Sequence, residues 1–271
     1  MTSYPSKNKK SEIPPLLNPP LVEAIFEVRW ELQGDQQTGR MKDPSYPMMY
    51  GRLYEKFKKS FSQIEDLPAV QVHPEASPFA VRHRMRKENG GWPLVQVGPG
   101  IATVNEAKEY SWSKFSKLCE EVVDGIVELY PTGTFPLNFI KAEVRFINAI
   151  PFDPNQTHPL AWAKDKMHLH VQMPGSLFTY EGLKDQAIGF GLNVAFPLDS
   201  ISGVLAISQN LGQVDNAPAF IVQTMVQSVG ETAPQDRAGM HEWLEEAHRA
   251  AEHTFLSLCE GDLMRQFASE V

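Results

Sequence analysis

Three arginines at alternate positions form the densest group of charge in the sequence. Arg82, Arg84 and Arg86 are separated by single residues, and Lys87 follows directly. A strand repeats every two residues, so it would place the three guanidinium groups on one face, about 7 Å apart. Such a row suits phosphates or an acidic protein surface. The alternative is a solvated outer face that keeps an edge strand from pairing. We take Arg82, Arg84, Arg86 and Lys87 as candidate binding residues.

A second set of charged residues lies on two other expected strands. Glu23, Glu27 and Arg29 share one face of the opening strand, and Arg145 lies on a later one. These side chains could pair across a sheet and fix two parts of the chain together. They could equally line a groove between those parts, where ligands commonly bind. Both interpretations stay open at this point.

No known catalytic or cofactor motif is present. The sequence lacks G-x-S-x-G, H-E-x-x-H, a P-loop and a G-x-G-x-x-G that opens a helix after a strand. His168 and His170 are spaced to share a strand face, but two ligands do not make a metal site. Cys119 and Cys259 lie in apolar helical stretches and are expected to be small buried residues. We therefore predict no metal and no cofactor, and favour a binding protein over an enzyme.

The composition indicates an ordinary globular protein. Of 271 residues, 42% are hydrophobic and 21% are charged. No run approaches the ~20 apolar residues that a membrane-spanning helix needs, and no secretory signal precedes the first strand, so we expect a cytoplasmic protein. The net charge of -8 argues against broad binding to nucleic acid.

Hydrophobic periodicity predicts the order of the elements. After Pro19 and Pro20, apolar residues recur at every second position to Leu32, which is typical of a strand with one face on a core. Further strands are expected over 81–86, 94–97, 101–105, 139–150, 167–173, 187–196, 203–209 and 219–229. Apolar stripes at helical spacing predict helices over 47–64, 112–129, 236–259 and 262–267.

This order suggests an internal duplication. Strands followed by a tryptophan-led helix occur once in each half of the chain. We predict an α+β protein of two weakly similar halves, each an antiparallel sheet packed by amphipathic helices. The expected boundaries are a disordered tail over 1–15, an N-terminal half over 16–133 and a C-terminal half over 134–271.

Several short motifs resemble those of a sporadically distributed family of uncharacterised bacterial proteins. They are the opening stretch PPLVEAIFEVR at 19–29, Asn105, YSWSKF at 110–115, VRFIN at 144–148, and His248 with Phe255. The resemblance implies a shared fold and no known reaction. The resemblance leads us to expect tyrosine as often as phenylalanine at position 146. Phe146 lacks the tyrosine hydroxyl, which weakens a catalytic role for this motif.

Two hypotheses follow for the function. The first is a non-enzymatic cytoplasmic binding or interaction protein whose residues 82–87 engage an acidic partner or an anionic ligand. The patchy distribution of the family places such a protein in a phage-defence, toxin–antitoxin or stress module, and a homodimer stays open. The second is an enzyme or nucleotide-sensing protein with a site in the groove between the halves, formed by Glu23, Glu27, Arg29 and Arg145.

Overall fold

The protein combines one large antiparallel sheet with five helices among the residues described, which confirms the α+β class. The computed structural model describes residues 16–34, 39–133 and 135–269. The expected disordered tail over 1–15 lies outside these ranges. Among the described residues, no helix is both long and apolar enough to cross a membrane.

The sheet has nine strands in the order β4-β5-β6-β7-β1-β8-β11-β10-β9, and every neighbouring pair is antiparallel. Its strands are β1 (Leu21–Trp30), β4 (Gln63–Asp66), β5 (His83–Lys87), β6 (Gly91–Gly98), β7 (Ile101–Glu106), β8 (Phe139–Pro151), β9 (Gly191–Leu198), β10 (Gly203–Val214) and β11 (Ala217–Val229). A separate ribbon pairs β2 (Gln33–Gly34) with β3 (Met41–Lys42).

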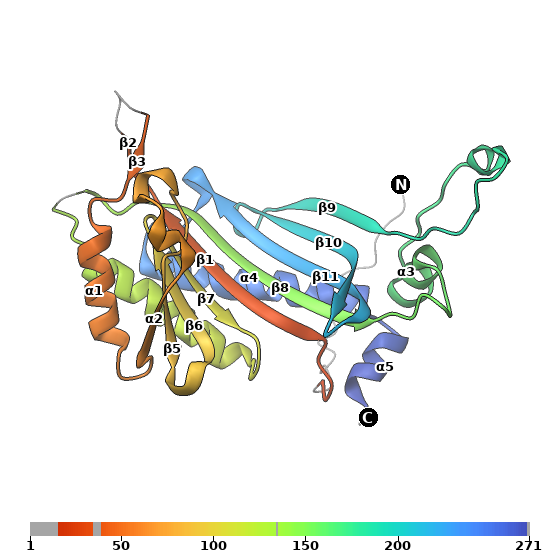
Figure 1. Ribbon diagram of the computed structural model, residues 1–271, viewed down its shortest axis with the longest axis horizontal. Helices are drawn as coiled ribbons and strands as arrows, with labels where there is room; N and C mark the ends of the chain where they lie inside the picture. The colour runs from red at the N-terminus through yellow and green to blue at the C-terminus, as the bar shows by residue number, and fades with distance from the viewer. Residues whose placement is uncertain (1–15, 35–38, 134, 270–271) are drawn as a thin grey trace.

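The first strands of the two halves lie side by side at the centre of this sheet. β1 pairs with β8, with Phe26 opposite Val144 and Glu27 opposite Glu143, and the two strands cross the middle of Figure 1 together. The two sheets that we expected are therefore joined edge to edge. From β1 to α2 the sheet strand is followed by a helix, four strands and a helix, and from β8 to α4 by a helix, three strands and a helix, so the order of the two halves is similar but not identical. That the halves arose by duplication stays a prediction.

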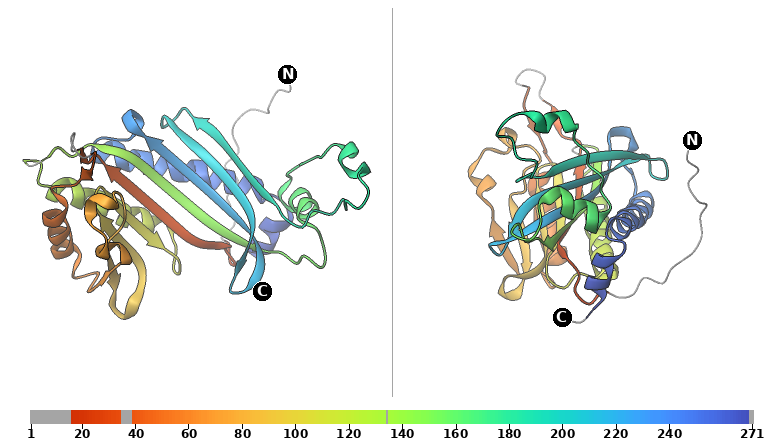
Figure 2. Two further views of the ribbon diagram at one scale, coloured as in Figure 1. Left: turned by 45° about the horizontal axis from the view of Figure 1, so that its top comes forward. Right: turned by 90° about the vertical axis from the view of Figure 1, so that its right-hand side faces the viewer.

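Three helices cover one face of the sheet. They are α1 (Tyr46–Phe57), α2 (Trp112–Leu129) and α4 (Arg237–Leu258), and both views in Figure 2 place α4 along the sheet on this side. β1 gives this core its alternate residues Ala24, Phe26, Val28 and Trp30, none more than 1% exposed. Burial of these apolar side chains holds the helices to the sheet.

A smaller core lies at the far end of β8 and β11. There α3 (Pro159–Met167) and α5 (Asp262–Ala268) pack on the strands, with the Trp162 and Phe220 rings stacked at 4.3 Å. Cys259 is buried in this core and Cys119 in the larger one, and both thiols are free, as expected.

Two predicted elements were wrong. The strand expected over 167–173 does not form, because Met167 ends α3 and His168 caps it in the left-handed region at φ 56°. Pro159 at the first helical turn and the His158 ring, which accepts the Ala161 N–H, start this helix. The helix expected over 47–64 ends at Phe57, and Ile64 lies in β4.

We expect Gly98→Ala to lower the free energy of unfolding by about 1–3 kcal/mol. A Cβ atom at Gly98 would lie 2.0 Å from the backbone oxygen of Ala80, so the backbone at Ala80 would have to shift. Gly51→Ala is the control, since nothing lies within 4 Å of that Cβ in α1 and the change should stabilise the helix. Urea denaturation measures both. Equal stability of the Gly98 variant and the parent would contradict this packing.

Candidate ligand pocket between the two halves

The structure places seven of the eight candidate site residues on the sheet face opposite the helices. Arg82, directly before β5, is 5% exposed. Its Nη2 donates to the carbonyl oxygens of Val70 (3.1 Å) and Val72 (2.6 Å), and its Nη1 donates to Ser77 Oγ at 3.3 Å. This guanidinium fixes the segment that follows β4 and is not free to bind a partner.

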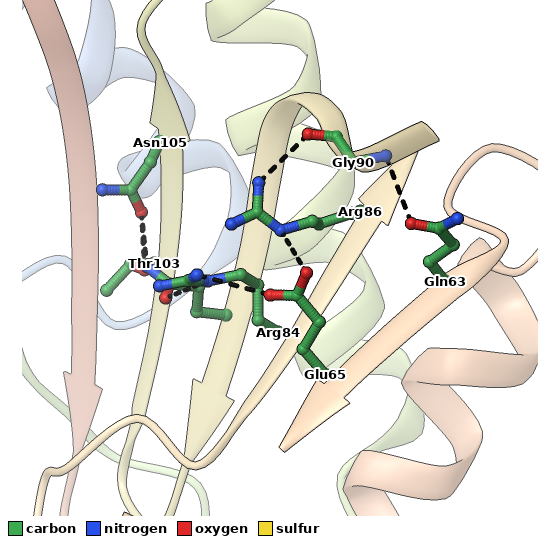
Figure 3. Close-up of polar contacts among 8 residues, drawn as sticks. Gln63, Glu65, Arg84, Arg86, Gly90, Thr103 and Asn105 are labelled. Atoms are coloured by element: carbon green, nitrogen blue, oxygen red, sulfur yellow. Dashed lines mark hydrogen bonds and ion pairs between the residues drawn. The ribbon is translucent and has the colours of Figure 1, made fainter. Parts of the chain in front are cut away.

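The other two arginines of the row share one carboxylate. Glu65 on β4 lies between them, with Oε1 2.7 Å from Arg86 Nε and Oε2 3.4 Å from Arg84 Nη1. Figure 3 shows both guanidinium groups turned toward Glu65. The ladder shifts register after Arg86, and Lys87 is exposed at the end of β5 beside Trp92 and Pro93. The three arginines of the predicted row are therefore engaged within the sheet, although Glu65 is the one carboxylate that pairs with them among the described residues.

A buried hydrogen-bond network continues across the next strands. Gln96 on β6 donates from Nε2 to Thr103 Oγ1 (3.2 Å) and Asn105 Oδ1 (2.9 Å), both on β7. Asn105 Nδ2 donates in turn to Glu23 Oε1 on β1 at 2.9 Å. Gln96, Thr103 and Asn105 are each less than 9% exposed, so the network supplies the partners that buried polar groups require.

The remaining groove residues belong to a chain of ion pairs over β1 and β8. Arg29 Nε lies 2.8 Å from Glu27 Oε1, Lys141 Nζ bridges Glu27 (2.9 Å) and Glu143 (2.8 Å), and Arg145 pairs with Glu143. Sequence reasoning left Lys141 and Glu143 out of the site, although both alternate with apolar residues on the same strand as Arg145. The chain joins the two halves, as the structural interpretation of these charges predicts.

Local charges set the ionisation of Glu27. Burial alone would raise the pKa of its carboxyl, but the hydrogen bond and charge of Lys141, with Arg29, outweigh burial and lower the pKa below its ordinary value of 4.5. Glu27 is thus an anion at neutral pH, held by two cations.

A pocket of about 510 Å³ opens on the helix side, where the two halves meet. Its walls come from the segment before β1, the loop from β7 to α2, strand β8 and helix α4. The volume falls within the range of about 300–1,000 Å³ that small-molecule sites occupy. None of the candidate residues predicted from charge lines this pocket.

Aromatic rings form one wall of the pocket. The His248 ring on α4 stacks on Trp112 with centroids 3.7 Å apart, and Phe146 meets it edge-on at 5.8 Å. Tyr110 in turn packs edge-on against Phe146 at 6.1 Å. Burial lowers the pKa of His248 to about 4, so the imidazole is neutral at physiological pH and offers one donor and one acceptor.

Three polar side chains of this wall have no hydrogen-bond partner among the described residues. They are the Tyr110 hydroxyl, the Asn148 amide and the His248 imidazole, and they come from three different elements. Asn148 is only 4% exposed. Its amide lines the pocket, where it is placed to form hydrogen bonds with a molecule bound there.

Residues quoted for the family resemblance converge on this pocket. The opening motif, the YSWSKF stretch, the VRFIN strand and the pair on α4 contribute Pro19, Pro20, Leu21, Val22, Tyr110, Phe146, Asn148, His248 and Phe255 to its lining. Sequence reasoning noted these residues only as motif members, because nothing in their spacing shows that they meet.

Within the described part of the chain, no group of three or more metal-ligating side chains is placed to hold an ion. No protein-family model matches this chain, and no curated protein matches its sequence.

We expect Arg82→Met to lower the free energy of unfolding by about 2 kcal/mol, because three hydrogen bonds from a buried cation are lost. Arg249→Met is the control, since Arg249 pairs with Glu246 on an exposed helix surface and should cost less than about 0.5 kcal/mol. Thermal and urea unfolding measure both. If Arg82→Met were as stable as the control variant, Arg82 would be free for binding instead.

The ion pairs of Glu27 predict a pH-dependent stability. Because folding lowers its pKa, the stabilisation is complete above about pH 4.5 and is lost as pH falls through the folded-state value. Glu27→Gln should therefore reduce stability by about 1 kcal/mol at neutral pH and by progressively less in acid. Urea midpoints across this pH range test it, and a constant difference at every pH would refute it.

Proposed function

We propose that this protein is a non-enzymatic binding protein that holds a small organic ligand in the pocket between its halves. The observation that supports this most is the trio of unpartnered polar groups on Tyr110, Asn148 and His248, set among aromatic rings. An apolar pocket with a few convergent polar groups is the usual form of a small-molecule site. We further propose that the protein acts in the cytoplasm.

The pocket geometry favours binding over catalysis. Among the described residues, no hydrogen bond or ion pair joins His248 to a carboxylate, hydroxyl or thiol, so no proton relay is set up. Burial also raises the pKa of Tyr110, which keeps its phenol protonated. The groups are suited to donate and accept hydrogen bonds rather than to exchange protons.

The anionic-partner hypothesis for residues 82–87 stays a prediction with less support. Arg82 serves backbone carbonyls, and Arg84 and Arg86 share Glu65. A role in a defence or stress module rests on the family resemblance alone. The second sequence hypothesis placed a site in a groove between the halves. The pocket also lies between the halves, but on the opposite side of the sheet from Glu27 and Arg145.

Filling the pocket should abolish ligand binding. Val22 lines the pocket and is 36% exposed, so Val22→Trp adds bulk there without disturbing the core. Val204→Trp is matched in size and exposure, since Val204 is also 36% exposed but lies on β10 away from the pocket. Calorimetric titration with indole as a probe should detect binding to the parent and to Val204→Trp only. Indole binding that survives Val22→Trp would overturn the pocket as the site.

A second variant separates binding from folding. Asn148→Leu removes an amide that has no partner to lose, so we expect weaker binding of indole with a melting temperature equal to or above that of the parent. A lower melting temperature with unchanged binding would make Asn148 a structural residue. Native mass spectrometry of protein purified gently from its host checks for a natural ligand.

A further inference from the structure

The lining of the pocket carries more negative than positive charge. Glu106, Glu109 and Glu252 line it, and Lys108 is the single cation in the lining. Among the described residues, none of these four side chains forms an ion pair. With His248 neutral, three carboxylates against one ammonium leave a formal charge of -2 in the lining.

Glu106 shows that this charge is held in place. It is 7% exposed at the end of β7, and its Oε1 accepts the backbone N–H groups of Lys108 (2.9 Å) and Glu109 (3.3 Å). These bonds fix one oxygen and tighten the loop into α2. A buried carboxylate without a cation is costly, so an incoming positive group would gain more here than at an exposed surface.

Resting on the proposed function, we infer that the pocket takes an organic cation with a planar ring. The ring packs against the wall that Phe146, His248 and Tyr110 form together, where Asn148 can bond its polar edge. The positive group lies toward Glu106, Glu109 and Glu252. An arylalkylamine, whose amino group is protonated at neutral pH, has this form. A nucleotide or other phosphate ester does not, because its charge would face the carboxylates.

The inference predicts an order of affinity within one set of probes that share a ring. Tryptamine, tryptophol and indole-3-acetate carry an ammonium, a hydroxyl and a carboxylate on the same indole, and calorimetry at neutral pH measures their dissociation constants. We expect tryptamine to bind at least about tenfold more tightly than indole-3-acetate, with tryptophol between them. Raising the ionic strength from about 0.01 M to about 1 M should shrink this ratio, since it shortens the Debye length from ~30 Å to ~3 Å.

Removing one carboxylate charge tests whether the pocket lining causes the preference for the cation. Glu252→Gln should weaken tryptamine binding by about threefold and leave tryptophol unchanged. Glu242→Gln, on the same helix but outside the lining, should change neither.

The outcomes distinguish the two proposals. Binding of all three probes with equal affinity, or tighter binding of the carboxylate, would overturn the cation inference and leave the pocket as a ligand site. Binding of none of them, with no small molecule retained in native mass spectra, would overturn the binding function and the inference together.

Discussion

The pairing of β1 with β8 is the contact on which the rest of the structure depends. β1 is the first strand in the chain, yet it lies between β7 and β8, so it closes the N-terminal half of the sheet and joins it to the C-terminal half. Its period of two sends Phe26 and Trp30 into the core and Glu27 and Arg29 to the opposite face. The prolines that precede it form an edge of the pocket. One strand thus fixes the core, the charged face and the pocket relative to one another.

The two sides of this sheet use polar residues in opposite ways. On the face without helices, the hydrogen bonds of Gln96 and Asn105 and the ion pairs from Arg29 to Arg145 link neighbouring strands. On the helix side, the side chains of Tyr110, Asn148 and His248 have no partner among the described residues, and buried polar atoms of Gln209 and Thr224 are unpaired as well. The pocket trio differs from these because its members line a cavity, where a bound molecule can supply the missing hydrogen bonds.

Much of the fold could be predicted from periodicity, and the failures have physical reasons. α2 was predicted at its observed limits because its stripe is long and it begins and ends at clear signals. β4 is short and partly exposed, so its few residues continued the apparent helical pattern of α1. This error hid Glu65, and with it the ion pairs of Arg84 and Arg86, although their common face was predicted correctly. The pocket residues could not be assembled in this way, since Tyr110, Asn148 and His248 are far apart in sequence and meet only through sheet pairing and the return of α4.

Because of the position of the pocket, ligand binding would also stabilise the arrangement of the two halves. Its walls come from both halves, with Val22 and Tyr110 from the first and Asn148 and His248 from the second. A molecule that bonds to both sides would stabilise their arrangement in proportion to its concentration over its dissociation constant. The ion pairs of Lys141 already hold the halves together on the other face, so the sheet does not need the ligand to form. Under the proposed function, the pocket is a preformed site at this junction, because the stacked His248 and Trp112 rings are in place without a ligand.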